Sequence, residues 1–150
     1  MEFDQYVTDK FPNICVAEGE IHSVGITRSS PEIERLKQEV AREITSRYTL
    51  ENVKHDPLFR AYRDFFWSVG VDPTKTRPAS EALVRRILSG GRLPAINTAV
   101  DAYNLASARS GVPIGAFDRD TIDGDLTMRF AEEGEQLIGI GMEKPILLRT

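Results

Sequence analysis

The pattern of apolar and polar positions predicts four helices in the middle of the chain. Ser30 and Pro31 supply the cap and first turn of a helix that we expect to run to about residue 47. Asp56 and Pro57 open a second helix in the same way, and Gly70 ends it. Apolar residues recur at helical spacing in both, at Ile33, Leu36, Val40 and Ile44, then at Leu58, Tyr62, Phe65, Phe66 and Val69. This spacing favours core aromatic rings over a base-stacking platform.

Two further helices follow closely. The third begins after Pro78 and ends at residues 89–91, with Arg85 and Arg86 expected to face outward. Its inward positions are Leu83, Val84, Ile87 and Leu88. The fourth, over residues 99–110, is capped by Asn97 or Thr98 and stops at Gly111. Because it is rich in alanine and small faces allow close approach, we expect it to be central and tightly packed.

Alternating apolar residues predict strands at both ends of the chain. Residues 14–26 favour two short strands joined at Gly19. After Pro113 the period changes to two, and residues 126–130 and 135–140 are predicted to pair as a hairpin that turns at residues 132–134. The expected fold class is therefore α+β, with helices packed on a mixed or antiparallel sheet.

Length and composition favour one domain over residues 1–150, with N-terminal strands and a helix in 1–55 and the rest in 56–150. Cys15 is the one cysteine, which excludes an intrachain disulfide, and we expect it to be a small buried residue of a strand. The N-terminus has no signal-peptide pattern and no apolar run is long enough to span a bilayer. A cytoplasmic location is the expectation.

The charge is unevenly distributed along the chain. A net charge of −4 argues against a general nucleic-acid coat protein, and residues 116–136 hold seven acids against two arginines. Between residues 75 and 92, however, only Glu81 opposes a basic group of Lys75, Arg77, Arg85, Arg86 and Arg92. This basic group can meet a phosphate backbone, and an ordinary solvated helix face is the alternative.

The sequence lacks the residue combinations that most catalytic mechanisms require. Neither His22 nor His55 lies beside a serine or cysteine motif, so a Ser-His-Asp or Cys-His set is not expected. There is no glycine-rich phosphate-binding motif. A group of four acids, Asp118, Asp120, Asp123 and Asp125, lacks the closing glutamate of an EF-hand and is interpreted as a turn of solvated acids. No cofactor or metal is implied.

Three polar side chains stand out on the alanine-rich helix. Asn97, Asp101 and Asn104 are spaced so that they can share one face. Such side chains must meet solvent, pair with one another or line a pocket. The structural alternative is a buried hydrogen-bond network that ties the helix to a loop, in which Asn97 serves only as a cap.

Three segments of the second half of the chain form a specific pattern: LPAINTAVDAYN (93–104), GVPIGAFD (111–118) and IDGDLTMRFAEEGE (122–135). In this order and at this spacing they resemble the B3/B4 module of the phenylalanyl-tRNA synthetase β subunit, and the resemblance covers residues 77–141. Residues 56–63 and 72–78 resemble the free-standing relatives of the domain. The resemblance therefore identifies a stand-alone B3/B4-like protein.

In the synthetase this module proofreads: it hydrolyses the ester of a wrongly attached amino acid, tyrosine in particular, on the tRNA 3′ end. The resemblance places Asn104 on a pocket-lining asparagine, Asp101 on an aspartate before it, and Phe117 and Asp118 on a Phe-Asp pair. Gly115 stands where the synthetase has a histidine. The substrate-binding residues that this implies, including the cap, are Asn97, Asp101, Asn104, Gly115, Phe117 and Asp118, near the first half of helix 99–110 and residues 113–118.

Two departures from the synthetase pattern leave the function open. Gly115 has no side chain to position a substrate or water. The resemblance also implies a pocket glutamate on further strands of the synthetase module, beyond the position that corresponds to Thr150. The chain is therefore either truncated or closed in a reduced form. The preferred hypothesis is a tRNA-binding protein without aminoacylation activity, whose partner is tRNA, aminoacyl-tRNA or a small amino acid. The alternatives are a hydrolase that edits mischarged aminoacyl-tRNA, with catalytic residues unknown, and a retained fold that binds a protein or an unrelated metabolite.

Overall fold

The computed structural model describes residues 1–138 and 143–148 and divides the chain into two compact units. The terminal unit consists of Met1–His22 and Asp118–Thr150, and the central unit is Ser23–Phe117. Five α-helices and four short strands in the described residues make the fold α+β, as predicted. This division does not test the expectation of one domain over residues 1–150, which stays a prediction.

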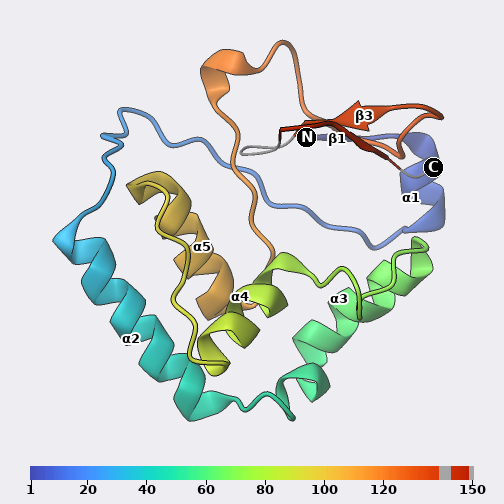
Figure 1. The fold of residues 1–150 in the computed structure, drawn as a ribbon. Helices are drawn as coiled ribbons and strands as arrows, with labels where there is room; N and C mark the ends of the chain where they lie inside the picture. Colours follow the sequence, from blue (N-terminus) through green and yellow to red (C-terminus); the bar gives the residue numbers. More distant parts are fainter. Residues whose placement is uncertain (139–142, 149–150) are drawn as a thin grey trace. The chain divides into compact units, whose positions relative to one another are not determined.

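The central unit contains the four predicted helices. They are α2 (Pro31–Arg47), α3 (Pro57–Ser68), α4 (Ala79–Leu88) and α5 (Thr98–Ser110), with a short 3-10 helix, η1 (Val53–His55), before α3 (Figure 1). Three caps follow the sequence pattern. The side chains of Ser30, Asp56 and Asn97 accept hydrogen bonds from the first-turn backbone N–H groups of α2, α3 and α5, at 3.2, 2.9 and 2.9 Å.

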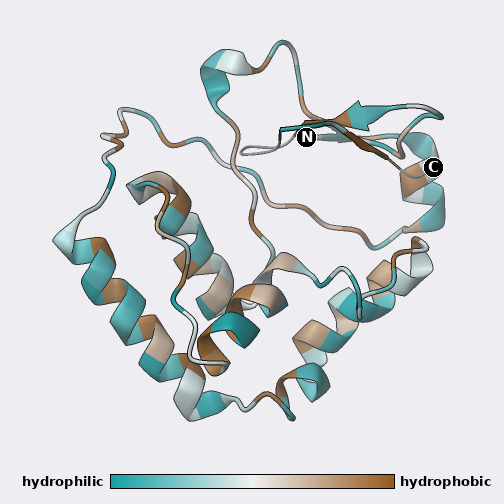
Figure 2. Cartoon of the chain, viewed as in Figure 1, coloured by the Kyte–Doolittle hydropathy of each residue, from teal (hydrophilic) through white to brown (hydrophobic). Residues whose placement is uncertain are grey.

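The core of the central unit forms where α2, α4 and α5 contact one another. Hydrophobic positions alternate with polar ones along α2, as its amphipathic pattern requires (Figure 2). The central position predicted for α5 is confirmed by its contacts with both α2 and α4. The buried apolar residues are Val40, Ile44, Val53, Phe59, Val84, Ile87, Leu93, Leu105 and Ala108.

Two details of the helix faces differ from expectation. On α3 the buried ring is Phe59, whereas Leu58 and Phe65 are exposed, so the buried face is rotated from the predicted stripe. On α5 Ala108 is buried but Ala102 and Ala106 are exposed. Periodicity locates an apolar face only to within a residue or so, because its edge positions can fall on either side of the boundary with solvent.

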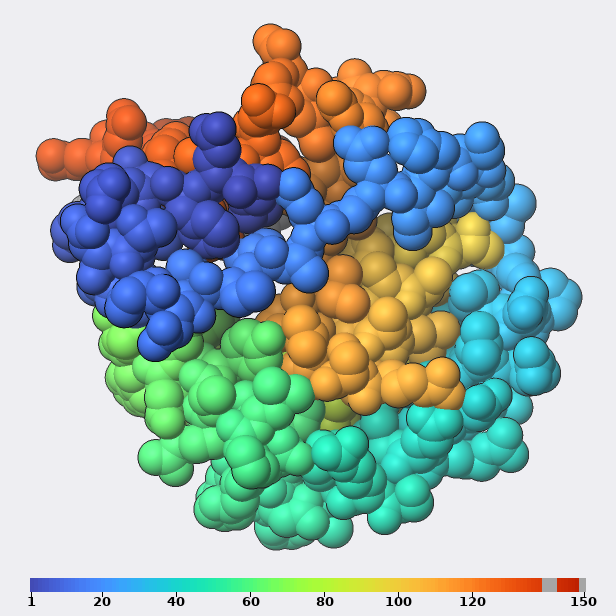
Figure 3. All heavy atoms as spheres, turned by 180° about the vertical axis from the view of Figure 1, so that it is seen from behind, coloured from blue at the N-terminus to red at the C-terminus, as the bar shows by residue number. Residues whose placement is uncertain are grey.

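The end of α5 lies against α3. Gly111 adopts a φ of 75°, the left-handed conformation that ends many helices, and a Cβ there would lie 2.6 Å from Cδ2 of Leu58. The hydroxyl of Ser107 donates to the Val112 carbonyl at 2.8 Å and so fixes the chain that leaves the helix. In the space-filling view the yellow and orange atoms of α5 and the following residues lie between α2 and α3 (Figure 3).

The terminal unit contains α1 (Gln5–Lys10), a 3-10 helix η2 (Arg119–Thr121), and two separate pairs of short strands. β1 (Glu2–Phe3) pairs in parallel with β2 (Thr127–Met128), and β3 (Gln136–Leu137) pairs antiparallel with β4 (Ile146–Leu147). The hairpin predicted between 126–130 and 135–140 is therefore wrong for the described residues, and residues 139–140 lie outside them. Alternation identified extended segments but not their partners.

The two strands predicted over residues 14–26 are also wrong. That segment has irregular backbone, and its alternating Val16, Ile21, Val24 and Ile26 side chains are exposed. Alternation stabilises a strand only where a partner strand and a buried face exist, and the described residues offer this segment neither. Cys15 is exposed, not buried as expected. Within the described residues, no helix has the length and apolar character needed to cross a membrane.

Candidate functional site

Asp101 forms the centre of a buried ionic network at the start of α5. Its side chain is only 1% exposed. One carboxylate oxygen accepts a hydrogen bond from Nζ of Lys37 at 2.7 Å, and the other accepts from the backbone N–H of Ile96 at 3.1 Å. Asp101 therefore joins α2, α5 and the loop before α5. The structural alternative, a network that ties the helix to a loop, is the arrangement observed for this residue.

The ammonium group of Lys37 is held between two carboxylates, since it also donates to Glu34 at 2.8 Å. Burial alone would lower the pKa of Lys37. The hydrogen bonds to Asp101 and Glu34 and the attraction of their charges outweigh burial and hold the pKa above its ordinary value of 10.5. Lys37 was missed from sequence, although it occupies the apolar face of α2 together with Ile33 and Val40.

Asn97 and Asn104 differ in the side-chain hydrogen-bonding groups that remain available to a ligand. The Asn97 side-chain oxygen is used by the backbone N–H of Val100, so this residue acts as the cap of α5. Asn104 lies one turn beyond Asp101 and is half-buried, and its side-chain amide makes no hydrogen bond within residues 1–138 and 143–148. A half-buried amide has donors and an acceptor to satisfy. The whole side-chain amide of Asn104 is therefore available to a substrate, whereas Asn97 has only its amide nitrogen left.

The remaining predicted residues follow α5 in the chain. Gly115 is exposed, and an added Cβ would meet no atom within 4 Å, so the backbone there is open to an approaching ligand. Phe117, the last residue of the central unit, is 71% exposed. Asp118 begins the second segment of the terminal unit, where its carboxylate accepts from the Asp120 N–H at 3.2 Å and caps η2. Contact of these residues with Asn104 stays a prediction.

The predicted basic group divides into exposed and occupied members. Lys75 is 84% exposed, and its Nζ lies 3.9 Å from an Asp72 oxygen. Arg77 and Arg92 are exposed, and Nε of the exposed Arg86 donates to the Arg92 carbonyl at 2.7 Å. The outward orientation predicted for Arg86 is thus confirmed. For Arg85 it is wrong.

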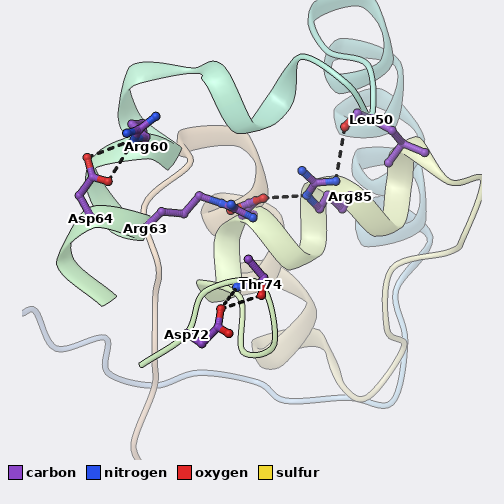
Figure 4. Close-up of polar contacts among 8 residues, drawn as sticks. Leu50, Arg60, Arg63, Asp64, Asp72, Thr74 and Arg85 are labelled. Atoms are coloured by element: carbon purple, nitrogen blue, oxygen red, sulfur yellow. Dashed lines mark hydrogen bonds and ion pairs between the residues drawn. The ribbon is translucent and has the colours of Figure 1, made fainter. Parts of the chain in front are cut away.

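Arg85 belongs to a buried ion triad instead (Figure 4). Nε of Arg85 donates to one oxygen of Glu81 at 2.7 Å, and Nε of Arg63 on α3 donates to the other at 2.8 Å. Glu81 is fully buried. Burial alone would raise the pKa of Glu81, but the two guanidinium groups hold it below its ordinary value of 4.5. Glu81 shares a helix face with Val84, which is the sequence signal for its burial.

The two units carry opposite net charge. The central unit holds fourteen Lys and Arg residues against ten Asp and Glu, a net of +4. The terminal unit holds five against thirteen, a net of −8. The four acids at positions 118–125 belong to the terminal unit and are exposed, and no group of His, Cys, Asp or Glu suited to a metal ion occurs in the described parts of the chain. Attraction for an anion is therefore concentrated in the central unit.

Residues 61–150 match the B3/4 domain family. Among curated proteins, the phenylalanine–tRNA ligase β subunit of Gloeobacter violaceus is 41% identical over 71 residues, which cover 46% of this chain and 9% of that subunit. The corresponding subunit of Nitrobacter winogradskyi is 28% identical over 123 residues, covering 78% of this chain and 14% of that subunit. The chain thus spans only about a tenth of the length of these relatives. No solved structure matches it significantly.

The family match begins in α3 and includes α4, α5 and the segment with Gly115 and Phe117. It therefore contains every residue of the predicted substrate-binding set and of the predicted basic group. Since the match covers more than half of the sequence, the chain belongs to the B3/4 domain family and carries a domain like that of the phenylalanine–tRNA ligase β subunit.

Proposed function

We propose that this protein is a free-standing B3/4 protein that binds tRNA or aminoacyl-tRNA through its central unit and does not attach amino acids to tRNA. The observation that carries the proposal is the separation of charge: the matched helices α3, α4 and α5 lie in the unit with a net charge of +4, although the chain as a whole is acidic. Neutralisation of phosphates supplies most of the free energy of non-specific RNA binding. This activity agrees with the expected cytoplasmic location.

The exposed members of the basic group are the proposed phosphate contacts. Lys75, Arg77, Arg86 and Arg92 are solvent-exposed on α4 and its flanking loops. Arg85 is excluded from this role because its guanidinium is bound to Glu81. The relatives are named as β subunits of phenylalanine–tRNA ligase, which makes tRNA the first nucleic acid to test.

The expected result is steep salt dependence that falls in a charge-reversed variant. For the double variant Lys75→Glu and Arg77→Glu, the slope of log K against log salt should fall by about two, since each phosphate contact contributes about one. The slope is measured from tRNA binding isotherms at several salt concentrations. A matched control, Arg35→Glu with Arg42→Glu, makes the same charge change at exposed positions of α2.

Comparison of the two double variants distinguishes phosphate contacts made by the basic group from an effect of net charge alone. The control is expected to keep the wild-type slope to within a few tenths. Equal slopes in all three proteins would show that the basic group does not contact phosphate. Absence of tRNA binding by the wild type at low salt would overturn the proposed function itself.

Hydrolysis of a mischarged aminoacyl-tRNA is the second candidate function, and one observation favours it. The half-buried Asn104 amide has no side-chain hydrogen-bond partner in the described residues, whereas both carboxylate oxygens of Asp101 and the side-chain oxygen of Asn97 are engaged. An amide donor of this kind can hold an ester carbonyl or a water, and the adjacent ribose hydroxyl of the substrate can assist the reaction.

Deacylation assays on a panel of aminoacyl-tRNAs, including the phenylalanine tRNA charged with tyrosine, test this candidate. Asn104→Ala is expected to slow hydrolysis about a hundredfold, the usual effect of removing one donor that stabilises the transition state. Gln38→Ala, which removes an exposed amide from α2, serves as the control and should be neutral. If the wild type binds tRNA but leaves every ester intact, the protein is a binding module and the hydrolase candidate is wrong.

A further inference from the structure

Trp67 is an exposed aromatic side chain that the core does not use. It is the only tryptophan in the sequence, it lies in the last turn of α3, and it is 56% exposed. The buried side of α3 is supplied by Phe59. A tryptophan side chain commonly buries 150–250 Å² when it packs. An indole left this open on a helix therefore has a large ring surface available to a partner.

Two arginines stand on the same face of α3 as Trp67. Arg63 precedes it by four residues and Arg60 by seven, which places both side chains in line with the indole. Arg60 is 66% exposed and uses its Nε in a hydrogen bond to Asp64 at 3.0 Å. Arg63 is held by the buried Glu81 (Figure 4). Because Glu81 occupies Arg63 as it does Arg85, the exposed Arg60 supplies the positive charge on this face, through the terminal nitrogens that its Nε bond to Asp64 leaves unused.

We infer that Trp67 stacks on an unpaired base of bound RNA, with Arg60 beside it as a contact to the sugar–phosphate backbone. This inference rests on the proposed function and adds a second contact, on α3, to the phosphate contacts proposed around α4. Every base has a π face, so stacking tolerates any sequence but needs a base that is not already paired. The net charge of +4 on the central unit favours a polyanionic partner over an apolar protein surface.

Because the chain has a single tryptophan, its fluorescence reports on this position alone. Addition of tRNA, or of a short single-stranded oligoribonucleotide, should quench the fluorescence in step with binding. A blunt RNA duplex of equal charge, in which all bases are paired, should bind without comparable quenching.

Substitution measures the contribution of the ring. Trp67→Ala should raise the Kd for the single-stranded oligonucleotide about fivefold to a hundredfold, and Trp67→Phe should restore most of the affinity. The matched control is Leu50→Ala, which removes another exposed apolar side chain of the central unit and should leave the Kd unchanged. Circular dichroism of each variant establishes that it is folded.

The outcomes separate this inference from the proposed function. If tRNA binds with steep salt dependence but neither the fluorescence nor the Kd responds at Trp67, the stacking contact is wrong and the tRNA-binding function stands. If the wild type self-associates and Trp67→Ala abolishes that association without changing RNA affinity, the indole is a protein contact and the inference is overturned. If no RNA binds at all, both proposals fail.

Discussion

Glu81→Gln is expected to lower the free energy of unfolding by about 3–5 kcal/mol, the usual cost of removing one partner from a buried ion pair. Glu81 is fully buried and accepts from Arg63 and Arg85 at 2.8 and 2.7 Å. Glutamine keeps the shape but replaces a carboxylate by an amide, so two largely buried guanidinium groups lose their counter-charge. Urea denaturation followed by circular dichroism gives the difference.

Asp64→Asn is the matched control, because it breaks an arginine–carboxylate pair of the same i, i+4 spacing at the surface of α3. Its expected cost is below about 0.5 kcal/mol. The acid dependence gives a second test. Since the folded-state pKa of Glu81 is lowered, its contribution is present above about 4.5 and is lost as the pH falls through the folded value. The Glu81→Gln variant should not show this loss of stability at acid pH. Equal losses of unfolding free energy in Glu81→Gln and Asp64→Asn would contradict the buried triad.

Lys37→Met is expected to lower the free energy of unfolding by about 3 kcal/mol. Methionine keeps most of the apolar stem of Lys37 but removes the ammonium group 2.7 Å from Asp101. The carboxylate, 1% exposed, would keep only the N–H of Ile96 as a partner. A buried carboxylate with so little compensation is costly, and the loss should also loosen the loop before α5. Thermal and urea denaturation measure the first effect, and hydrogen exchange at Ile96 measures the second.

Lys54→Met, at an exposed position in η1, should change the stability by no more than about 0.5 kcal/mol. Alkaline pH distinguishes the two lysines further. The folded-state pKa of Lys37 is raised, so its stabilising contribution is present below 10.5 and is lost as the pH rises through the folded value. Wild type should show this alkaline loss and Lys37→Met should not. An unchanged hydrogen-exchange rate at Ile96 would contradict the proposed link between Asp101 and the loop.

Helices were predictable from sequence because their signals are local. Ser30 and Pro31, then Asp56 and Pro57, fixed the starts of α2 and α3, and Gly111 fixed the end of α5. Strand pairing was not predictable, because a strand's partner is set by distant segments. β2 pairs in parallel with β1 from the start of the chain, which carries no signal in the alternation of residues 126–130.

The site was predicted in part for the same reason. The spacing of Asn97, Asp101 and Asn104 identified the polar face of α5. It did not reveal that Asp101 is neutralised by Lys37 on another helix. A charged residue on an apolar helix face indicates burial, but only the packing of α2 on α5 selects its partner. The outward orientation predicted for Arg85 was wrong for the same reason, because its partner Glu81 is buried by the packing of the helices.

The pairing of β1 with β2 has a consequence for the order in which the chain folds. The hydrogen bonds from Glu2 to Leu126 and from Asp4 to Met128 close a loop that contains the whole central unit. Closing so long a loop carries an entropy cost that the nearer contacts within the central unit avoid. During synthesis β1 emerges before the central unit but has no partner until β2 leaves the ribosome. The central unit is therefore expected to fold co-translationally, and β1 is expected to pair with β2 only afterwards.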